Sequence, residues 1–210
     1  MIKLQNIRHS YNNDNFIIKN FSLNIGKSES IGLTGPSGCG KSTLAHIISG
    51  YITPSSGKVL IKGMDFTGQP SRNIFLISQE SDLFPWQKVK KQIEFALKEK
   101  SARRIDEILA LVKLEKYKNY YPAQLSGGMK KRLSLARALA VNPKLLILDE
   151  AFVSLDSELK NNLYCELREI WQTTKTAILV ITHDIIDLEN LVEKRLTYEQ
   201  QAKKFNNDFY

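Results

Sequence analysis

A glycine-rich run followed by a lysine and two hydroxyl side chains is the clearest chemical signal in this sequence. Residues 35–43 read GPSGCGKST and lie between an apolar segment and a segment with helical spacing. Glycines let successive backbone N–H groups point at one centre, where the N-terminus of a helix adds positive potential. In such a loop Lys41 reaches the β and γ phosphates of a nucleotide, and the Ser42 hydroxyl ligates Mg²⁺. The alternative is a glycine-rich turn without a ligand. The predicted nucleotide contacts of the loop are Gly35, Ser37, Gly38, Cys39, Gly40, Lys41, Ser42 and Thr43.

Two carboxylates end a second apolar segment. Residues 145–150 read LLILDE. After a phosphate loop, Asp149 would hold Mg²⁺ through water, and Glu150 would orient or deprotonate the attacking water. Taken alone, the pattern also fits a buried strand that emerges into polar residues. The presence of the phosphate loop favours the catalytic interpretation.

Two further polar residues directly follow apolar segments. His183 comes after residues 177–182, and Gln79 comes after residues 74–78. Ligands of open α/β sheets gather at the carboxyl ends of the strands, so both side chains are candidates for the same site. A lone histidine is more often a structural or surface residue. The assignment of His183 to the γ-phosphate therefore depends on the phosphate loop and the paired carboxylates.

A second glycine-rich helix start lies in the middle of the chain. Residues 125–129 read LSGGM, so Ser126 is a candidate helix N-cap and Gly127 and Gly128 leave backbone N–H groups uncovered. Such a helix start is a second anion site. Because one nucleotide needs only one phosphate loop, this site suggests that the ATP of another subunit docks there. The alternative is a glycine-rich helix start with no ligand.

Alternating strand-like and helix-like segments must position these motifs. The strand-like segments are residues 2–8, 16–25, 30–34, 58–62, 74–77, 144–148 and 176–182. The helix-like segments are residues 41–50, 86–114, 126–142 and 157–171, the first with Gly50 as a left-handed cap. This alternation predicts an α/β fold with a mostly parallel sheet flanked by helices on both faces. The helical pattern of residues 81–125 predicts an inserted lobe.

Composition limits the class of protein. The chain has 210 residues, 42% apolar and 25% charged, which fits one folded globular unit. Its apolar runs are too short to span a bilayer and its start lacks a secretory signal, so we expect a cytoplasmic location. Cys39 and Cys165 provide neither a disulfide framework nor a zinc spacing. The net charge of +8 includes a basic cluster at residues 130–132, which we interpret as a solvated helix face rather than a nucleic-acid site.

The whole set of motifs resembles the ATPase subunits of ATP-binding cassette (ABC) transporters, over residues 1 to about 198. In that family Tyr11 would be the adenine-stacking aromatic, residues 35–43 the Walker A loop, and Gln79 the Q-loop residue that approaches Mg²⁺. Residues 125–129 match the family signature, residues 145–150 the Walker B strand, and residues 154–156 the D-loop. The resemblance assigns Asp156 to the D-loop and makes His183 the switch histidine.

The resemblance implies a fold, a domain organisation and two cofactors. We expect residues 1–210 to form a single ABC ATPase domain with the P-loop NTPase fold, which binds ATP and Mg²⁺. Residues 1–80 and about 126–198 would form the nucleotide-binding core with an N-terminal antiparallel β subdomain, and residues 81 to about 125 the helical insert. Residues 196–198 resemble a worn version of the next strand. A polar tail, residues 199–210, would follow without a further hairpin or sensing domain.

The resemblance also implies partners. A second ABC ATPase subunit, most simply a second copy, would complete each ATP site head to tail. Transmembrane permease subunits and an extracytoplasmic solute-binding protein would complete the system, with this chain at the cytoplasmic face of the membrane and no nucleic acid bound. Residues 83–86 (LFPW) and Met129 look like the subgroup that imports nitrate, sulfonates, taurine and thiamine precursors. The alternative for residues 83–86 is an aromatic turn found across the family.

Three other functions are compatible with many of these motifs, and some positions differ from the family pattern. An exporter or cell-envelope ATPase, a nucleic-acid or ribosome-associated cassette, and a nucleotide-binding subunit without catalysis would share many of these motifs. Ala151 stands where most relatives have proline, and residues 184–190 lack the usual acidic–alanine pair. Cys39, at a helix N-terminus, is either a tolerated small residue or a redox-sensitive thiol.

Overall fold

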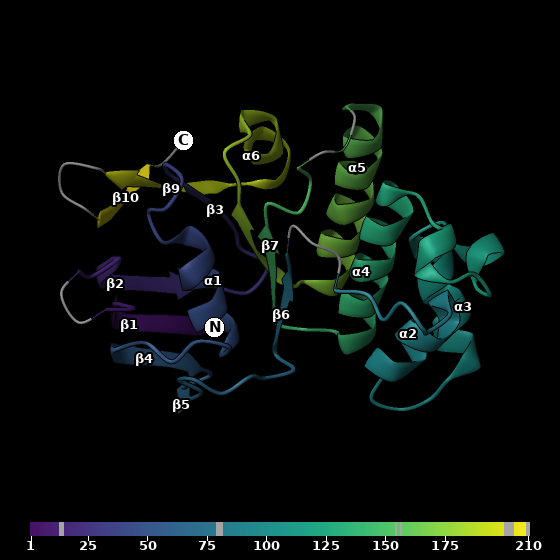
Figure 1. The fold of residues 1–210 in the computed structure, drawn as a ribbon, viewed down its shortest axis with the longest axis horizontal. Coiled ribbons are helices and arrows are strands. Elements are labelled where there is room, and N and C mark those ends of the chain that lie inside the picture. Colours follow the sequence, from purple (N-terminus) through teal and green to yellow (C-terminus); the bar gives the residue numbers. More distant parts are fainter. Residues whose placement is uncertain (13–14, 79–81, 154, 156, 200–203, 209–210) are drawn as a thin grey trace.

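The computed structural model describes residues 1–12, 15–78, 82–153, 155, 157–199 and 204–208. Two sheets lie side by side, with helices between and beyond them (Figure 1). The first is antiparallel, with strand order β2-β1-β4-β5. Its strands are β1 (Ile2–His9), β2 (Ile18–Ile25), β4 (Ser56–Ile61) and β5 (Met64–Asp65). This sheet confirms the expected N-terminal antiparallel subdomain.

The second sheet has six strands in the order β10-β9-β3-β8-β7-β6, and all neighbours except β10 and β9 are parallel. The strands are β3 (Ser30–Thr34), β6 (Ile74–Ile77), β7 (Leu145–Asp149), β8 (Ala177–Ile181), β9 (Lys194–Glu199) and β10 (Lys204–Asp208). Strands β7 and β8 are buried along their whole length, as expected for parallel strands covered on both faces.

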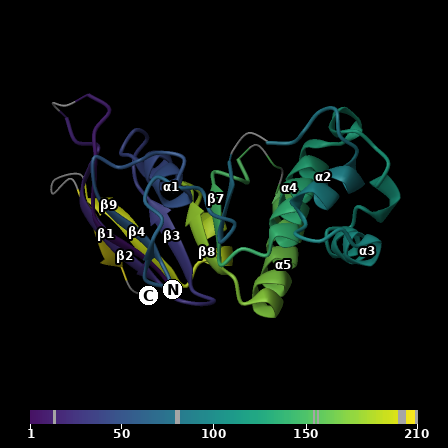
Figure 2. The ribbon, with the colours of Figure 1, turned by 90° about the horizontal axis from the view of Figure 1, so that it is seen from below.

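Alternate residues of the central strands enter two different cores. Leu145, Ile147 and Leu179 pack in a cluster with α1 (Lys41–Ser49) and the antiparallel sheet. Leu146 and Val180 enter the other cluster, which includes α4 (Gly127–Val141) and α5 (Ser157–Thr174). Figure 2 shows the parallel sheet between these two groups. Helix α1 is therefore held between both sheets, and the predicted α/β class with helices on both faces is confirmed.

The helical pattern of residues 86–114 is two helices instead of one. Helix α2 (Val89–Ala96) ends at Leu97, whose backbone is extended, and α3 (Ala102–Leu111) begins after the N-cap Ser101. Two short 3₁₀ turns follow, Glu115–Tyr117 and Pro122–Gln124. Both helices pack against α4 (Figure 2). The exact division of the chain into core and insert stays a prediction.

The end of the chain differs from the expectation. Helix α6 (Ile185–Leu191) precedes β9, and β10 forms an antiparallel pair with β9 that joins Lys204 to Glu199 and Asp208 to Arg195. Part of the predicted polar tail is thus a strand, and the expectation of no further hairpin was wrong. Polar residues can pair here because an edge strand needs only backbone partners. Within the described part of the chain, no helix combines the length and apolarity needed to cross a bilayer.

We expect Leu179→Ala to lower the free energy of unfolding by about 2–5 kcal/mol, because a fully buried side chain of the central strand leaves a cavity between well-packed neighbours. Urea denaturation followed by circular dichroism measures this loss. The control, Ile185→Ala, removes an exposed side chain and should change the value by less than about 0.5 kcal/mol. Equal losses in the two variants would contradict the assignment of β8 to the core.

Candidate nucleotide site

The phosphate loop occupies the turn from β3 to α1. Gly40 is the N-cap of α1 and has a left-handed backbone, with φ 99°. A Cβ atom there would lie 2.6 Å from Cγ2 of Ile17, so both the backbone and the space select glycine. Gly38 also has positive φ, at 79°, but faces open space. The loop therefore curls as the sequence predicted, and it places the first turn of α1 at the carboxyl end of β3.

Lys41 lies within the loop. Its ammonium donates to the carbonyl oxygens of Gly35 and Pro36, at 2.9 and 3.0 Å, and the residue is only 8% exposed. Both acceptors are neutral. A phosphate oxygen is a stronger partner because its negative charge adds direct Coulomb attraction to the hydrogen bond from the ammonium. The loop thus keeps a cation available at the place where a phosphate would bind.

Asp149, the last residue of β7, is buried and close to the first turn of α1. Burial raises the pKa of its carboxyl group, a hydrogen bond with Ser42 lowers it, and the nearby charge of Glu150 raises it again, with a net increase. Its Oδ1 atom is buried and has no hydrogen-bond partner among the described residues. A buried carboxylate with an unused oxygen beside a hydroxyl is an oxygen-ligand pair that a divalent cation such as Mg²⁺ fits.

Glu150 and His183 follow neighbouring strands and meet. Oε1 of Glu150 lies 3.4 Å from Nδ1 of His183. Glu150 has a left-handed backbone, with φ 48°, and its N–H donates to the carbonyl oxygen of Ile181 at 2.8 Å. Left-handed backbone in a non-glycine residue is unfavourable and often found at functional sites. The turn after β7 is thereby directed toward the turn after β8.

Tyr11 reaches the same site from the antiparallel sheet. Its hydroxyl group lies 3.1 Å from Oγ1 of Thr43, within the phosphate loop. The ring is exposed on one side, and on another it contacts His9 edge-on, with 4.8 Å between ring centroids. This geometry anchors the hydroxyl end while Tyr11 stays 60% exposed, which suits the predicted contact with a base.

The second predicted anion site begins α4. Ser126 caps this helix, accepting a hydrogen bond from the N–H of Met129 at 3.3 Å, as the sequence predicted. A Cβ atom added to Gly127 would meet no atom within 4 Å. Among the described residues, no hydrogen bond or ion pair joins this helix start, including Gly128, to the phosphate loop.

Two predicted site residues, Gln79 and Asp156, lie outside the described residues. Sequence reasoning also missed residues behind His183, namely Lys160, Tyr164 and Asp187, which form a buried polar cluster. The only signal for it was a lysine and a tyrosine four positions apart in a helix whose other inward residues are apolar.

Cys39 is buried, whereas Cys165 on α5 is exposed. Burial raises the pKa of the Cys39 thiol, and the nearby charge of Lys41 only partly opposes this, so the thiolate is disfavoured. The structure therefore supports the simple small-residue interpretation of Cys39 over the redox alternative.

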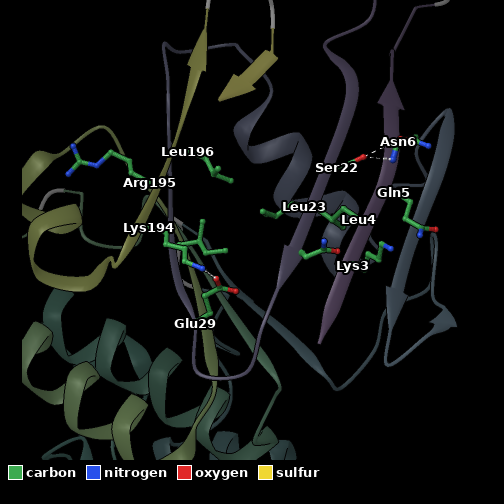
Figure 3. Close-up of a pocket in the computed structure, with 12 residues that line it drawn as sticks. Lys3, Leu4, Gln5, Asn6, Ser22, Leu23, Glu29, Lys194, Arg195 and Leu196 are labelled. Carbon is green, nitrogen blue, oxygen red and sulfur yellow. Dashed lines mark hydrogen bonds and ion pairs between the residues drawn. The ribbon is translucent and has the colours of Figure 1, made fainter. Parts of the chain in front are cut away.

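A polar hollow of about 610 Å³ lies at the opposite end of β3 (Figure 3). It is lined by β1, β2 and β9, and an ion pair between Lys194 and Glu29 closes one side. None of the predicted site residues lines it. Ligands of parallel sheets bind at the carboxyl ends of the strands, so size alone does not make this hollow the nucleotide site.

A parallel sheet, a phosphate loop after β3, and two acidic residues at the end of β7 define a nucleotide-binding domain of the P-loop class. The family model described as "ABC transporter" matches residues 18–153. The chain belongs to this family, so the predicted family is confirmed.

Similar proteins agree with this assignment. The chain is 37% identical to the nitrate import ATP-binding protein NrtD of Synechocystis sp. over 84% of the chain and 68% of that protein. It is 40% identical to the aliphatic sulfonates import ATP-binding protein SsuB of Bacillus subtilis, over 81% and 68%. The first of the curated relatives, an uncharacterised ATP-binding protein of Methanocaldococcus jannaschii, is matched over only 65% of its length.

A solved structure confirms the fold. A dimeric ATP-binding cassette in a post-hydrolysis state, bound to ADP and Pi, superposes with a TM-score of 0.85 at 28% identity, covering 100% of this chain and 98% of that one. A bacterial Atm1-family exporter with ATP bound gives a TM-score of 0.81 at 23% identity, over 95% of this chain and 37% of that one, and supports the fold alone.

Asp149→Asn should raise the melting temperature at pH 7 in the absence of divalent cations and nucleotide. Burial raises the pKa of Asp149 above its ordinary value of 3.8, so the folded chain favours the neutral carboxyl group. The contribution of this neutral group to stability is fully present below pH 3.8. The contribution is lost as pH rises through the folded-state pKa, since the buried group must then carry a charge. The advantage of the variant should therefore shrink as pH falls toward 4.

Differential scanning calorimetry at several pH values in EDTA measures this difference. With Mg-ATP the order should reverse, because ligand binding stabilises only the chain that retains the carboxylate. A variant that melts below the wild type at pH 7 in EDTA would show that the charged Asp149 carboxylate does not destabilise the ligand-free chain.

Proposed function

We propose that this chain binds and hydrolyses ATP and powers a membrane transporter. The observation that carries the proposal is the convergence of three features at one edge of the parallel sheet. These are the loop that holds Lys41, the buried Asp149 beside Ser42, and the contact between Glu150 and His183. Hydrolysis of a phosphoanhydride requires this combination of a cation, a metal ligand and a positioned polar pair.

Each residue has a chemical task in this proposal. Lys41 and the loop N–H groups bind the β and γ phosphates and offset their charge. Glu150 accepts a hydrogen bond from the attacking water. His183 contacts the γ-phosphate and helps to position the same water. Tyr11 stacks on the base. Because β7 and β8 are buried and rigid, they present the two side chains in fixed positions.

Mg²⁺ is the proposed metal. Ser42 and Asp149 would hold it, since the carboxylate has an unused buried oxygen and lies next to the hydroxyl. When bound, the ion supplies charge neutralisation for the β and γ phosphates. From the family motifs, Gln79 of the Q-loop is proposed as a further Mg²⁺ ligand, and Asp156 of the D-loop as a residue that contacts the nucleotide.

The proposed active form is a head-to-tail dimer of this chain. Ser126 and Gly127, at the N-terminus of α4, are exposed, and a Cβ atom at Gly127 would meet open space, so this helix start is accessible to a second subunit's nucleotide. That the similar cassette bound to ADP and Pi is dimeric supports a two-subunit form. Binding of ATP between two subunits makes hydrolysis depend on closure of the dimer.

Import of a small anion or vitamin precursor is the proposed role of the transporter. The names of similar proteins, which import nitrate or aliphatic sulfonates, support this choice. The proposed partners are transmembrane permease subunits and an extracytoplasmic solute-binding protein, with the chain at the cytoplasmic face of the membrane. The exposed rings of Trp86 and Phe95, which both pack on Phe84, form an apolar surface suited to a permease segment.

Glu150→Gln should bind ATP normally but hydrolyse it at least about a hundredfold more slowly, because the amide cannot accept a proton from water. Phosphate release measures turnover, and size-exclusion chromatography with Mg-ATP should show an accumulated dimer. The control, Glu189→Gln, changes an exposed glutamate of α6 and should leave turnover unchanged. Near wild-type turnover in the Glu150 variant would remove this residue from catalysis.

Ser126→Arg should abolish turnover and leave the ATP affinity of the monomer within about twofold. A bulky cation at the start of α4 blocks the partner's nucleotide but not the chain's own loop. Ser101→Arg is the matched control, because Ser101 caps α3 in the same way, accepting from the N–H of Arg104 at 3.2 Å. A Ser126→Arg variant that is monomeric and fully active would refute the two-subunit site.

A further inference from the structure

A buried polar cluster lies directly behind the turn that carries His183. Its centre is Asp187 of α6, which is 1% exposed. Oδ1 of this carboxylate accepts a hydrogen bond from the hydroxyl of Tyr164 on α5, and Oδ2 accepts one from the hydroxyl of Thr182 at 2.7 Å. The two helices thus meet through a carboxylate and not only through apolar packing.

Lys160 supplies the positive charge of the cluster. Its Nζ atom lies 2.6 Å from Oδ2 of Asp184 and 3.6 Å from Oδ1 of Asp187. The lysine side chain is only 14% exposed, so the charge acts on both carboxylates with little screening by water. Loss of this charge would leave Asp187 buried with only two neutral donors, which is an unfavourable state for a carboxylate.

The cluster holds the backbone on both sides of His183. The N–H of Asp184 donates to Oγ1 of Thr182 at 3.0 Å, and Oδ1 of Asp184 accepts from the N–H of Ile186 at 2.9 Å. The imidazole itself is 66% exposed, and its Nδ1 atom lies 3.4 Å from Oε1 of Glu150. Its position therefore depends on the backbone turn, because few neighbouring side chains enclose it.

We propose that Lys160 is a positioning residue for His183, acting through Asp184 and Asp187. This inference rests on the proposed function, in which His183 and Glu150 act on the same water. Lys160 lies in the first turn of α5, which begins at Ser157, directly after the predicted D-loop. It ties the start of α5 to the histidine turn, so a shift of α5 changes the distance between His183 and Glu150. Displacements of about 1 Å at a catalytic group can reduce the rate strongly.

If the ion pairs of Lys160 with Asp184 and Asp187 only stabilise the fold, a different result is expected. In that case loss of Lys160 would lower stability but leave the surroundings of His183 and the turnover of the folded protein unchanged. The matched control is Lys194→Met, which removes the ion pair between Lys194 and Glu29. This pair lies at the opposite end of the parallel sheet, beside the polar hollow. Lys160→Arg keeps the charge and should restore the wild-type behaviour.

Histidine-selective NMR measures the effect directly. The chain contains three histidines, His9, His46 and His183, and a His183→Ala spectrum assigns the third signal. Lys160→Met should move the ring signal of His183 by more than its linewidth and leave the other two in place. Lys194→Met and Lys160→Arg should leave the His183 signal unmoved. An unmoved His183 signal in folded Lys160→Met would overturn the inference.

Kinetics provide the second readout. Lys160→Met should lower kcat about tenfold, with KM for ATP within about twofold, since the phosphate loop is untouched. Unchanged kcat with only a lower melting temperature would assign Lys160 to stability alone. If Lys160→Met does not fold, Asp184→Asn removes the charge pair but keeps the acceptor for Ile186, and the same results are expected. A wild-type chain without ATPase activity would refute the proposed function, whereas the NMR result would still decide whether Lys160 positions His183.

Discussion

Strand β8 forms parallel backbone hydrogen bonds with β3 on one side and β7 on the other, and this shared register determines the geometry of the site. Leu33, Ile181 and Asp149 lie in one row across the three strands. The residues that follow this row leave the sheet together, so the phosphate loop, Glu150 and His183 emerge at one edge. The bond from the N–H of Glu150 to Ile181 extends the same register beyond the strand. A slip of one residue in β8 would separate the histidine from the glutamate.

The site concentrates groups that are costly in a folded protein without a ligand. Lys41 and Asp149 are both nearly buried, the pKa of Asp149 is raised by burial, and Glu150 has a left-handed backbone. Each of these features disfavours the folded chain. The apolar clusters on the two faces of the parallel sheet offset this cost, because β7 and β8 contribute fully buried side chains to both. Stability thus comes from the strands, and reactivity from the turns that follow them.

Local signals predicted much of this arrangement from the sequence. Gly50 ends α1 in a left-handed conformation and Ser126 caps α4, because each position depends on its own residue type. The break between α2 and α3 was missed because residues 86–114 contain neither glycine nor proline, and Ser101 was its only local signal. Strand β10 was missed because pairing at a sheet edge leaves no apolar alternation in the sequence. The cluster around Asp187 was missed because it joins α5 to α6, and only the folded chain brings them together.

The two cysteines differ in a way that has a practical consequence. Cys39 is shielded within the phosphate loop and its thiolate is disfavoured by burial, whereas Cys165 is exposed on α5 next to Tyr164. An alkylating reagent such as a maleimide therefore reacts first with α5 and spares the loop. A fluorophore attached in this way needs no engineered cysteine. It sits on the helix whose first turn is tied to the histidine, and so can report in real time when that helix moves during a catalytic cycle.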